Sequence, residues 1–184
     1  MRTCLLCLLV SVTGVSVGTR FAPTSEDLRK MYGKPSNVAP GRNGTPDSET
    51  FVLVEHIMLA AQYGADGQAC ILALEPSSIT GPESERNHEL LMSNTSTSEI
   101  MEQVAPTDKR GKVLPGSAII CAGYPGFATE DYENVYIHRD IRCTVTKGPA
   151  SAIVLSDKRV RVWFKRTVCP KPDWYPSKSP SPPG

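Results

Sequence analysis

The sequence predicts an α+β domain, with an antiparallel sheet meander, two or three short helices and two disulfides. Three observations support this fold class. Apolar, β-branched segments of strand length recur between clusters of Gly, Pro, Asn and Asp. Two further windows carry helix-capping residues and an apolar face. Four cysteines follow residue 18, and an even number of cysteines predicts two bridges in an exported protein.

Residues 1–18 are expected to form a cleavable signal peptide. Arg2 supplies the positive charge, and the apolar run over 4–15 is too short to span a bilayer. Ser16 and Gly18 are small, as a signal peptidase requires before its cleavage site. We therefore expect a secreted or periplasmic protein with no membrane span after the signal is removed.

The charge balance restricts the kinds of partner. The chain has 20 Lys and Arg against 19 Asp and Glu, and loss of Arg2 with the leader leaves 19 of each. A neutral domain argues against nucleic acid as a partner. The expected partner is therefore a protein, a peptide or an envelope component.

Four segments are expected along the chain. They are the signal peptide (1–18), an N-terminal helix and loop (19–48), the α+β domain (49–169) and a Pro-rich disordered tail (170–184). The N-terminal helix is predicted over 25–32, with Ser25 as its cap and Gly33 at its end.

Two more helical windows precede the last third of the chain. Residues 84–92 carry a weaker signal, whereas Ser96 and Glu99 match a capping box for a helix that Pro106 ends. The preceding strands contain the clearest turn, because Asp66 and Gly67 stand between two apolar runs and predict a hairpin.

The last third predicts strands at 117–121, 132–146, 152–155 and 160–166. A turn-rich break over 123–126 and a polar turn over 156–159 are expected to separate them. Side chains alternate between the two faces of the strand predicted over 132–146. One face carries Val135, Ile137, Ile141 and Cys143, and the opposite face carries Tyr136, His138 and Asp140.

The four retained cysteines are Cys70, Cys121, Cys143 and Cys169. Four cysteines permit three pairings, and composition does not choose among them. The order of the strands favours Cys121 with Cys143, because these residues lie at two neighbouring β segments. Cys70 and Cys169 then remain to join the last strand to the first hairpin.

No motif for catalysis, a cofactor or a metal is recognised. His56, His88 and His138 lack metal-ligand spacing, and the nucleophile elbow G-x-S-x-G is absent. Cys121 with His138 resembles a thiol–base pair, but a bridge is the expected state of Cys121. We expect a non-catalytic binding domain without a cofactor; a small extracytoplasmic hydrolase with an unrecognised site is the alternative.

Aromatic residues give the binding signal. Tyr124, Phe127, Tyr132 and Tyr136 cluster in sequence around a Gly-Pro turn. Aromatic side chains near loops are favoured contact residues. These four residues are the expected binding surface.

Several stretches together resemble a known group of proteins. They are Met31-Tyr32-Gly33-Lys34-Pro35, the run Tyr-Gly-Ala-Asp-Gly-Gln-Ala-Cys over 63–70, the segment from Val104-Ala105-Pro106 through Arg110-Gly111-Lys112, the segment from Tyr132-Glu133-Asn134-Val135 through Arg142-Cys143, and Trp163-Phe164-Lys165-Arg166. In this order they resemble small exported bacterial proteins of unassigned function, such as those of acidobacterial genomes. The resemblance implies a periplasmic or secreted bacterial product and assigns no functional residue.

Overall fold

The computed structural model describes residues 21–41, 47–53, 57–77, 91–121, 126–145 and 153–176. The expected signal peptide, Tyr124, His56, His88 and nearly all of the helix expected at 84–92 lie outside these ranges. Met92, at the end of that window, belongs to a short strand instead.

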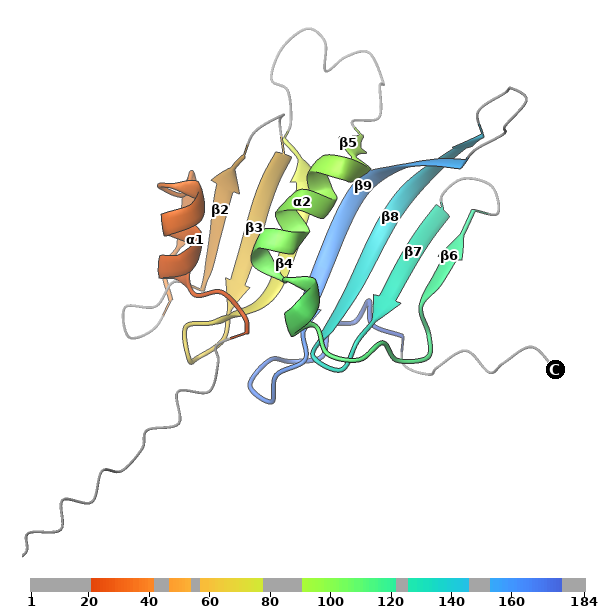
Figure 1. The fold of residues 1–184 in the computed structure, drawn as a ribbon. Helices are drawn as coiled ribbons and strands as arrows, with labels where there is room; N and C mark the ends of the chain where they lie inside the picture. Colours follow the sequence, from red (N-terminus) through yellow and green to blue (C-terminus); the bar gives the residue numbers. More distant parts are fainter. Residues whose placement is uncertain are drawn as a thin grey trace, which may run out of the picture.

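A single antiparallel sheet dominates the fold (Figure 1). Its strands are β1 (Asn37–Ala39), β2 (Ser48–Val52), β3 (Ile57–Tyr63), β4 (Ala69–Pro76), β5 (Met92–Ser93), β6 (Ala118–Ile120), β7 (Gly126–Asp131), β8 (Val135–Val145) and β9 (Ile153–Phe164). The order is β1-β2-β3-β4-β9-β8-β7-β6, with β5 paired to β9 off this path. The sheet therefore consists of two meanders that meet where β4 pairs with β9.

The strand predictions for the last third need two corrections. β9 runs unbroken through 156–159, where we expected a polar turn, because Asp157 is fully buried and bonded beneath a helix. β7 begins at Gly126, the last residue of the expected turn-rich break, and continues to Asp131, where no strand was predicted. Its Gly, Thr and acidic residues give little strand signal, and its pairing with both β6 and β8 holds it in the sheet.

Two α-helices belong to the described part of the chain. Helix α1 (Ser25–Tyr32) has the predicted bounds, but Thr24 is its N-cap and forms a capping box with Asp27. Helix α2 (Asn94–Val104) begins two residues before Ser96, so the predicted capping box is wrong: Ser93 is the N-cap. A 3-10 turn, η2 (Thr107–Lys109), follows.

Both helices contribute to one hydrophobic core on one face of the sheet (Figure 1). Leu28 of α1 and Met101 of α2 are buried with sheet residues that include Phe51, Leu59, Leu72 and Phe164. The alternation predicted for β8 agrees with this core, because Val135 and Ile137 belong to it and Ile141 is also fully buried. Both helices pack on the same face of the sheet, so neither helix covers the opposite face.

The C-terminal segment (residues 170–176) contacts that opposite face. The Tyr175 ring lies 4.7 Å from that of Tyr136 and 5.1 Å from that of Trp163, and the Arg161 guanidinium lies 5.1 Å from the Trp174 ring. The expectation of a disordered tail from residue 170 is therefore wrong for 170–176, because these aromatic contacts order it; residues 177–184 lie outside the described ranges.

Two disulfides join Cys70 to Cys169 and Cys121 to Cys143, the pairing that the strand order favoured. The second bridge lies beside Gly126 of β7, where a Cβ atom would stand 3.2 Å from the Cys143 sulfur and 2.8 Å from the Ile120 carbonyl oxygen. Glycine at this position lets the chain approach that closely.

Within the described ranges, the structure contains no helix long and apolar enough to cross a membrane.

Candidate functional site

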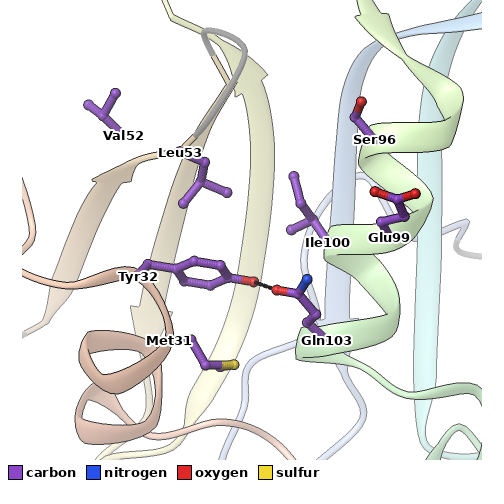
Figure 2. Close-up of a pocket in the computed structure, with 8 residues that line it drawn as sticks. All are labelled: Met31, Tyr32, Val52, Leu53, Ser96, Glu99, Ile100 and Gln103. Carbon is purple, nitrogen blue, oxygen red and sulfur yellow. Dashed lines mark hydrogen bonds between the residues drawn. The ribbon is translucent and has the colours of Figure 1, made fainter.

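A groove lies between α1 and α2, at the C-terminal end of β2 (Figure 2). Its volume is about 470 Å³. We call it the interhelix groove, and it is lined by Met31, Tyr32, Val52, Leu53, Ser96, Glu99, Ile100 and Gln103. These residues come from three segments that are far apart in the sequence.

Helical periodicity explains the α2 wall. Ser96, Glu99, Ile100 and Gln103 follow one another at spacings of three, one and three residues, which keeps them on one side of the helix. Ile100 is the buried member and anchors that side in the core. The polar members therefore form the rim above an apolar floor.

The α1 wall consists of the last helical turn. Met31 and Tyr32 precede Gly33, whose φ of +80° ends the helix and turns the chain away. The Tyr32 hydroxyl donates a hydrogen bond of 3.0 Å to Gln103 Oε1 on the other wall. Burial raises the pKa of Tyr32 to about 12, so its hydroxyl stays neutral and able to donate.

Apolar side chains in the groove remain open to solvent. Met31 is 42% exposed and Val52 is 59% exposed, which is high for side chains of their size. Of the eight lining residues, only Glu99 carries a formal charge. Four of the eight lining residues are apolar, and the other four carry a polar group that can form hydrogen bonds.

A buried carboxylate fixes α1 to the sheet. Glu49 of β2 is 1% exposed and accepts a hydrogen bond of 2.7 Å from Arg29 Nε and another of 2.7 Å from the Tyr63 hydroxyl. Burial and the Glu49 carboxylate raise the pKa of Tyr63 well above its usual value. Each partner satisfies the buried charge, so α1 has a defined position on β2.

A second buried network fixes α2. Asp157 of β9 is fully buried, and its Oδ2 accepts hydrogen bonds from the Thr97 hydroxyl, from Asn94 Nδ2 at 3.3 Å and from Arg139 at 2.9 Å. Asn94 and Thr97 belong to the first turns of α2. An ion pair from Arg29 to Glu49 thus holds the α1 wall to the sheet, and hydrogen bonds from Asn94 and Thr97 to the Asp157 carboxylate hold the α2 wall.

The structure does not bring the predicted aromatic surface together. Phe127 is 36% exposed and stacks on His138, with ring centroids 5.9 Å apart. Tyr136 lies on the same sheet face but is only 3% exposed, because Trp174 and Tyr175 cover it.

Tyr132 belongs to the other face of the sheet. It packs against the helix-side core, and its hydroxyl donates a hydrogen bond of 2.8 Å to Glu130. Tyr124 lies outside the described residues. Only Phe127 among the three described residues therefore offers a substantial exposed ring.

The thiol–base pair considered from the sequence is not formed. Cys121 is bridged to Cys143, so it has no thiol for His138 to activate. His138 instead contacts Asp140, with 3.1 Å between Nε2 and Oδ1. This hydrogen bond, together with Arg161, holds the pKa of Asp140 below its usual range. Among the described residues, no group of three or more His, Cys, Asp or Glu is placed to hold a metal.

The interhelix groove is not predicted from the sequence, because no motif marks it. The α2 spacing was a usable signal, since Ser96, Glu99 and Gln103 share a side of the helix that the core does not occupy. Met31 and Val52 gave none, because an apolar residue in the last turn of a helix or at a strand end is ordinarily assigned to the core.

The fold and its cysteines define a class, the disulfide-bonded antiparallel α+β domains. No protein-family model matches the chain, and no curated protein matches it in sequence. Among solved structures it is similar to a DUF4309 family protein from Bacillus subtilis, at 13% identity and a TM-score of 0.38, over 83% of this chain and 84% of that chain.

A second similar structure is a cysteine-rich secretory protein from Staphylococcus aureus. The identity is 10% and the TM-score 0.33, over 81% of this chain and 44% of that chain. Neither likeness carries a functional assignment.

Proposed function

We propose that this protein is an exported, non-catalytic binding domain and that the interhelix groove binds its ligand. The observation that carries the proposal is the open groove of about 470 Å³ with Met31 and Val52 exposed in it. Ligand pockets generally fall between about 300 and 1,000 Å³. The two disulfides support an oxidising location, secreted or periplasmic.

The lining indicates the chemistry of the ligand. Met31, Val52, Leu53 and Ile100 offer apolar contact to a chain or ring. Glu99 is exposed at the rim and would attract a cationic group at one end of that ligand. We therefore propose an amphiphilic ligand with an apolar body and a cationic head, such as an apolar side chain next to a basic one in a partner peptide.

The first experiment fills the groove. Ser96 lines it, whereas Ser98 is exposed on the same helix and does not line it. The neutral fluorophore N-phenylnaphthylamine reports on apolar binding by its emission. We expect Ser96→Trp to weaken binding of the dye at least tenfold and Ser98→Trp to leave it unchanged. Equal effects of the two variants would refute the groove as the site.

The second experiment tests the cationic head. Dodecylammonium and dodecanoate have the same chain and opposite charges, so their ability to displace the dye isolates the charge. We expect dodecylammonium to displace it at a concentration roughly two- to fivefold lower, as for a partly exposed charge pair. Glu99→Gln should remove that difference, whereas Glu26→Gln on the exposed first turn of α1 should preserve it.

A further inference from the structure

The edge strand β6 is the second place where exposed apolar side chains gather. It ends the strand order, so within the described chain its outer side has no strand partner (Figure 1). Ile119 is 65% exposed and Ile120 is 42% exposed. Phe127 of β7 is paired directly with Ile120 and is 36% exposed. Together these residues form an apolar strip along the sheet edge, with Ile119 on one face of the sheet and Ile120 and Phe127 on the other.

The strip continues along β7 before β6 begins. Val113 forms an isolated antiparallel bridge with Tyr132 and is 65% exposed, and the Leu114 amide donates a hydrogen bond of 2.7 Å to the Asp131 carbonyl. From 113 to 121 the sequence is Val-Leu-Pro-Gly-Ser-Ala-Ile-Ile-Cys, which contains no charged side chain. We call residues 113–121 with Phe127 the β6 edge.

Strand β6 itself contains no charged residue and no proline, although it is only three residues long and Pro115 precedes it. Charged residues, prolines and bulges protect edge strands in most proteins. At the opposite edge, Pro40 directly follows β1 and removes a backbone donor, whereas Ser117 and Cys121 adjoin β6 and keep theirs. The bridge from Cys121 to Cys143 also ties the end of β6 to the interior strand β8.

We propose that a second copy of this chain pairs with the β6 edge, antiparallel and about a twofold axis. An uncharged strip meets its own copy without like-charge repulsion, which a twofold contact requires. With the axis at Ile119, the middle residue of β6, the two Ile119 side chains lie opposite each other and each Ala118 faces the partner's Ile120.

The size of the edge determines how stable this dimer is. A standard interface buries about 800 Å² per partner, and pairing three residues alone falls short of that area. Val113 and Phe127 enlarge the contact beyond β6 but leave it at the small end of the range. The dimer is therefore weak and forms between micromolar and millimolar protein concentrations.

Sedimentation velocity of residues 19–184 with intact disulfides tests the proposal over that concentration range. We expect the wild-type protein to shift from monomer to dimer. Ile119→Lys should raise the dissociation constant at least tenfold, because the substitution occurs twice at the axis. Val38→Lys on β1, where the side chain is 43% exposed, should leave it unchanged.

A crosslinking variant separates a specific pairing from general stickiness. Residues directly opposite in an antiparallel pair have Cα atoms about 4.5–5.5 Å apart, within reach of a disulfide. Ile119→Cys should therefore give a covalent dimer under mild oxidation, and Val38→Cys should not. A wild-type protein that stays monomeric throughout, or equal crosslinking of the two variants, overturns the proposal.

Discussion

The Tyr32 hydroxyl on α1 donates a hydrogen bond to the Gln103 side chain on α2, with 3.0 Å between the two oxygens. The bond crosses the interhelix groove and joins residues that are 71 positions apart in the sequence. It sets the separation of the two walls at one end (Figure 2). The shape of the groove therefore depends on this contact as well as on the core below it.

Removing this contact should loosen the groove without unfolding the protein. We expect Tyr32→Phe to lower the free energy of unfolding by about 1 kcal/mol, the usual net value of such a hydrogen bond. Urea unfolding of Tyr32→Phe, Gln103→Leu and the double variant measures the coupling. Strictly additive effects of the two substitutions would show that the bond contributes nothing in solution.

Alkaline pH should weaken the fold through the tyrosines. The pKa of Tyr32 is raised from 10.0 to about 12 in the folded chain, so folding favours the neutral phenol. That stabilisation is complete below the unfolded pKa of 10.0 and is lost as pH rises toward about 12. Phenolate absorbance and urea unfolding across this interval measure it.

The pH experiment has a direct comparison. Tyr32→Phe should lose less stability than the wild-type protein between pH 10.0 and about 12, because one titrating group is gone. Identical pH profiles for the two proteins would contradict the assigned burial of Tyr32.

The buried pair of Arg139 and Asp157 should contribute far more than an exposed pair. Asp157→Ala leaves Arg139 with Glu130, at 3.5 Å, and without its closest carboxylate. We expect a loss of about 3 kcal/mol, because one buried charge loses its main partner. Glu75→Ala breaks the exposed contact to Arg159 and should cost about 1 kcal/mol or less. Thermal unfolding compares the two variants, and similar losses would contradict the burial of Asp157.

The parts of the fold that the sequence predicted well depend on local interactions. Helix α1 has the predicted bounds because a cap, acidic first-turn residues and Gly33 act within ten residues of one another. The hairpin at Asp66 and Gly67 joins β3 to β4 as expected, since Gly67 adopts a φ of +75°.

The errors arose where distant residues decide the structure. The polarity of Asp157 suggested a turn. Asp157 can instead be buried in a strand because Arg139 and Thr97, which are far from it in the sequence, donate hydrogen bonds to its carboxylate. The interhelix groove was missed for the same reason, because residues near 31, 52 and 100 meet only after folding. The cysteine pairing was predictable because four cysteines allow only three pairings, and the expected order of the strands favoured one of them.

The two disulfides should differ in their contribution to stability. Cys70 and Cys169 close a span of 99 residues, whereas Cys121 and Cys143 close one of 22. The chain-entropy model gives about 4.7 and about 3 kcal/mol for such spans. We expect the Cys70→Ser, Cys169→Ser double variant to unfold at lower urea concentration than the Cys121→Ser, Cys143→Ser variant.

The disulfide comparison has a built-in check. Thiol titration of the folded wild-type protein, residues 19–184, should find no free thiol, since all four cysteines of that span are bridged. The reverse order of stability for the two variants would show that strain or unfolded-state structure outweighs loop length.

Mapping ligand contacts by nuclear magnetic resonance tests the interhelix groove most directly. Dodecylammonium is added to the isotope-labelled protein, and amide shifts are followed residue by residue. We predict the largest shifts at Leu53, Ile100 and Gln103, and their loss in Ser96→Trp. Shifts centred on Phe127 and Trp174, or none at the three groove residues, would contradict the proposed site.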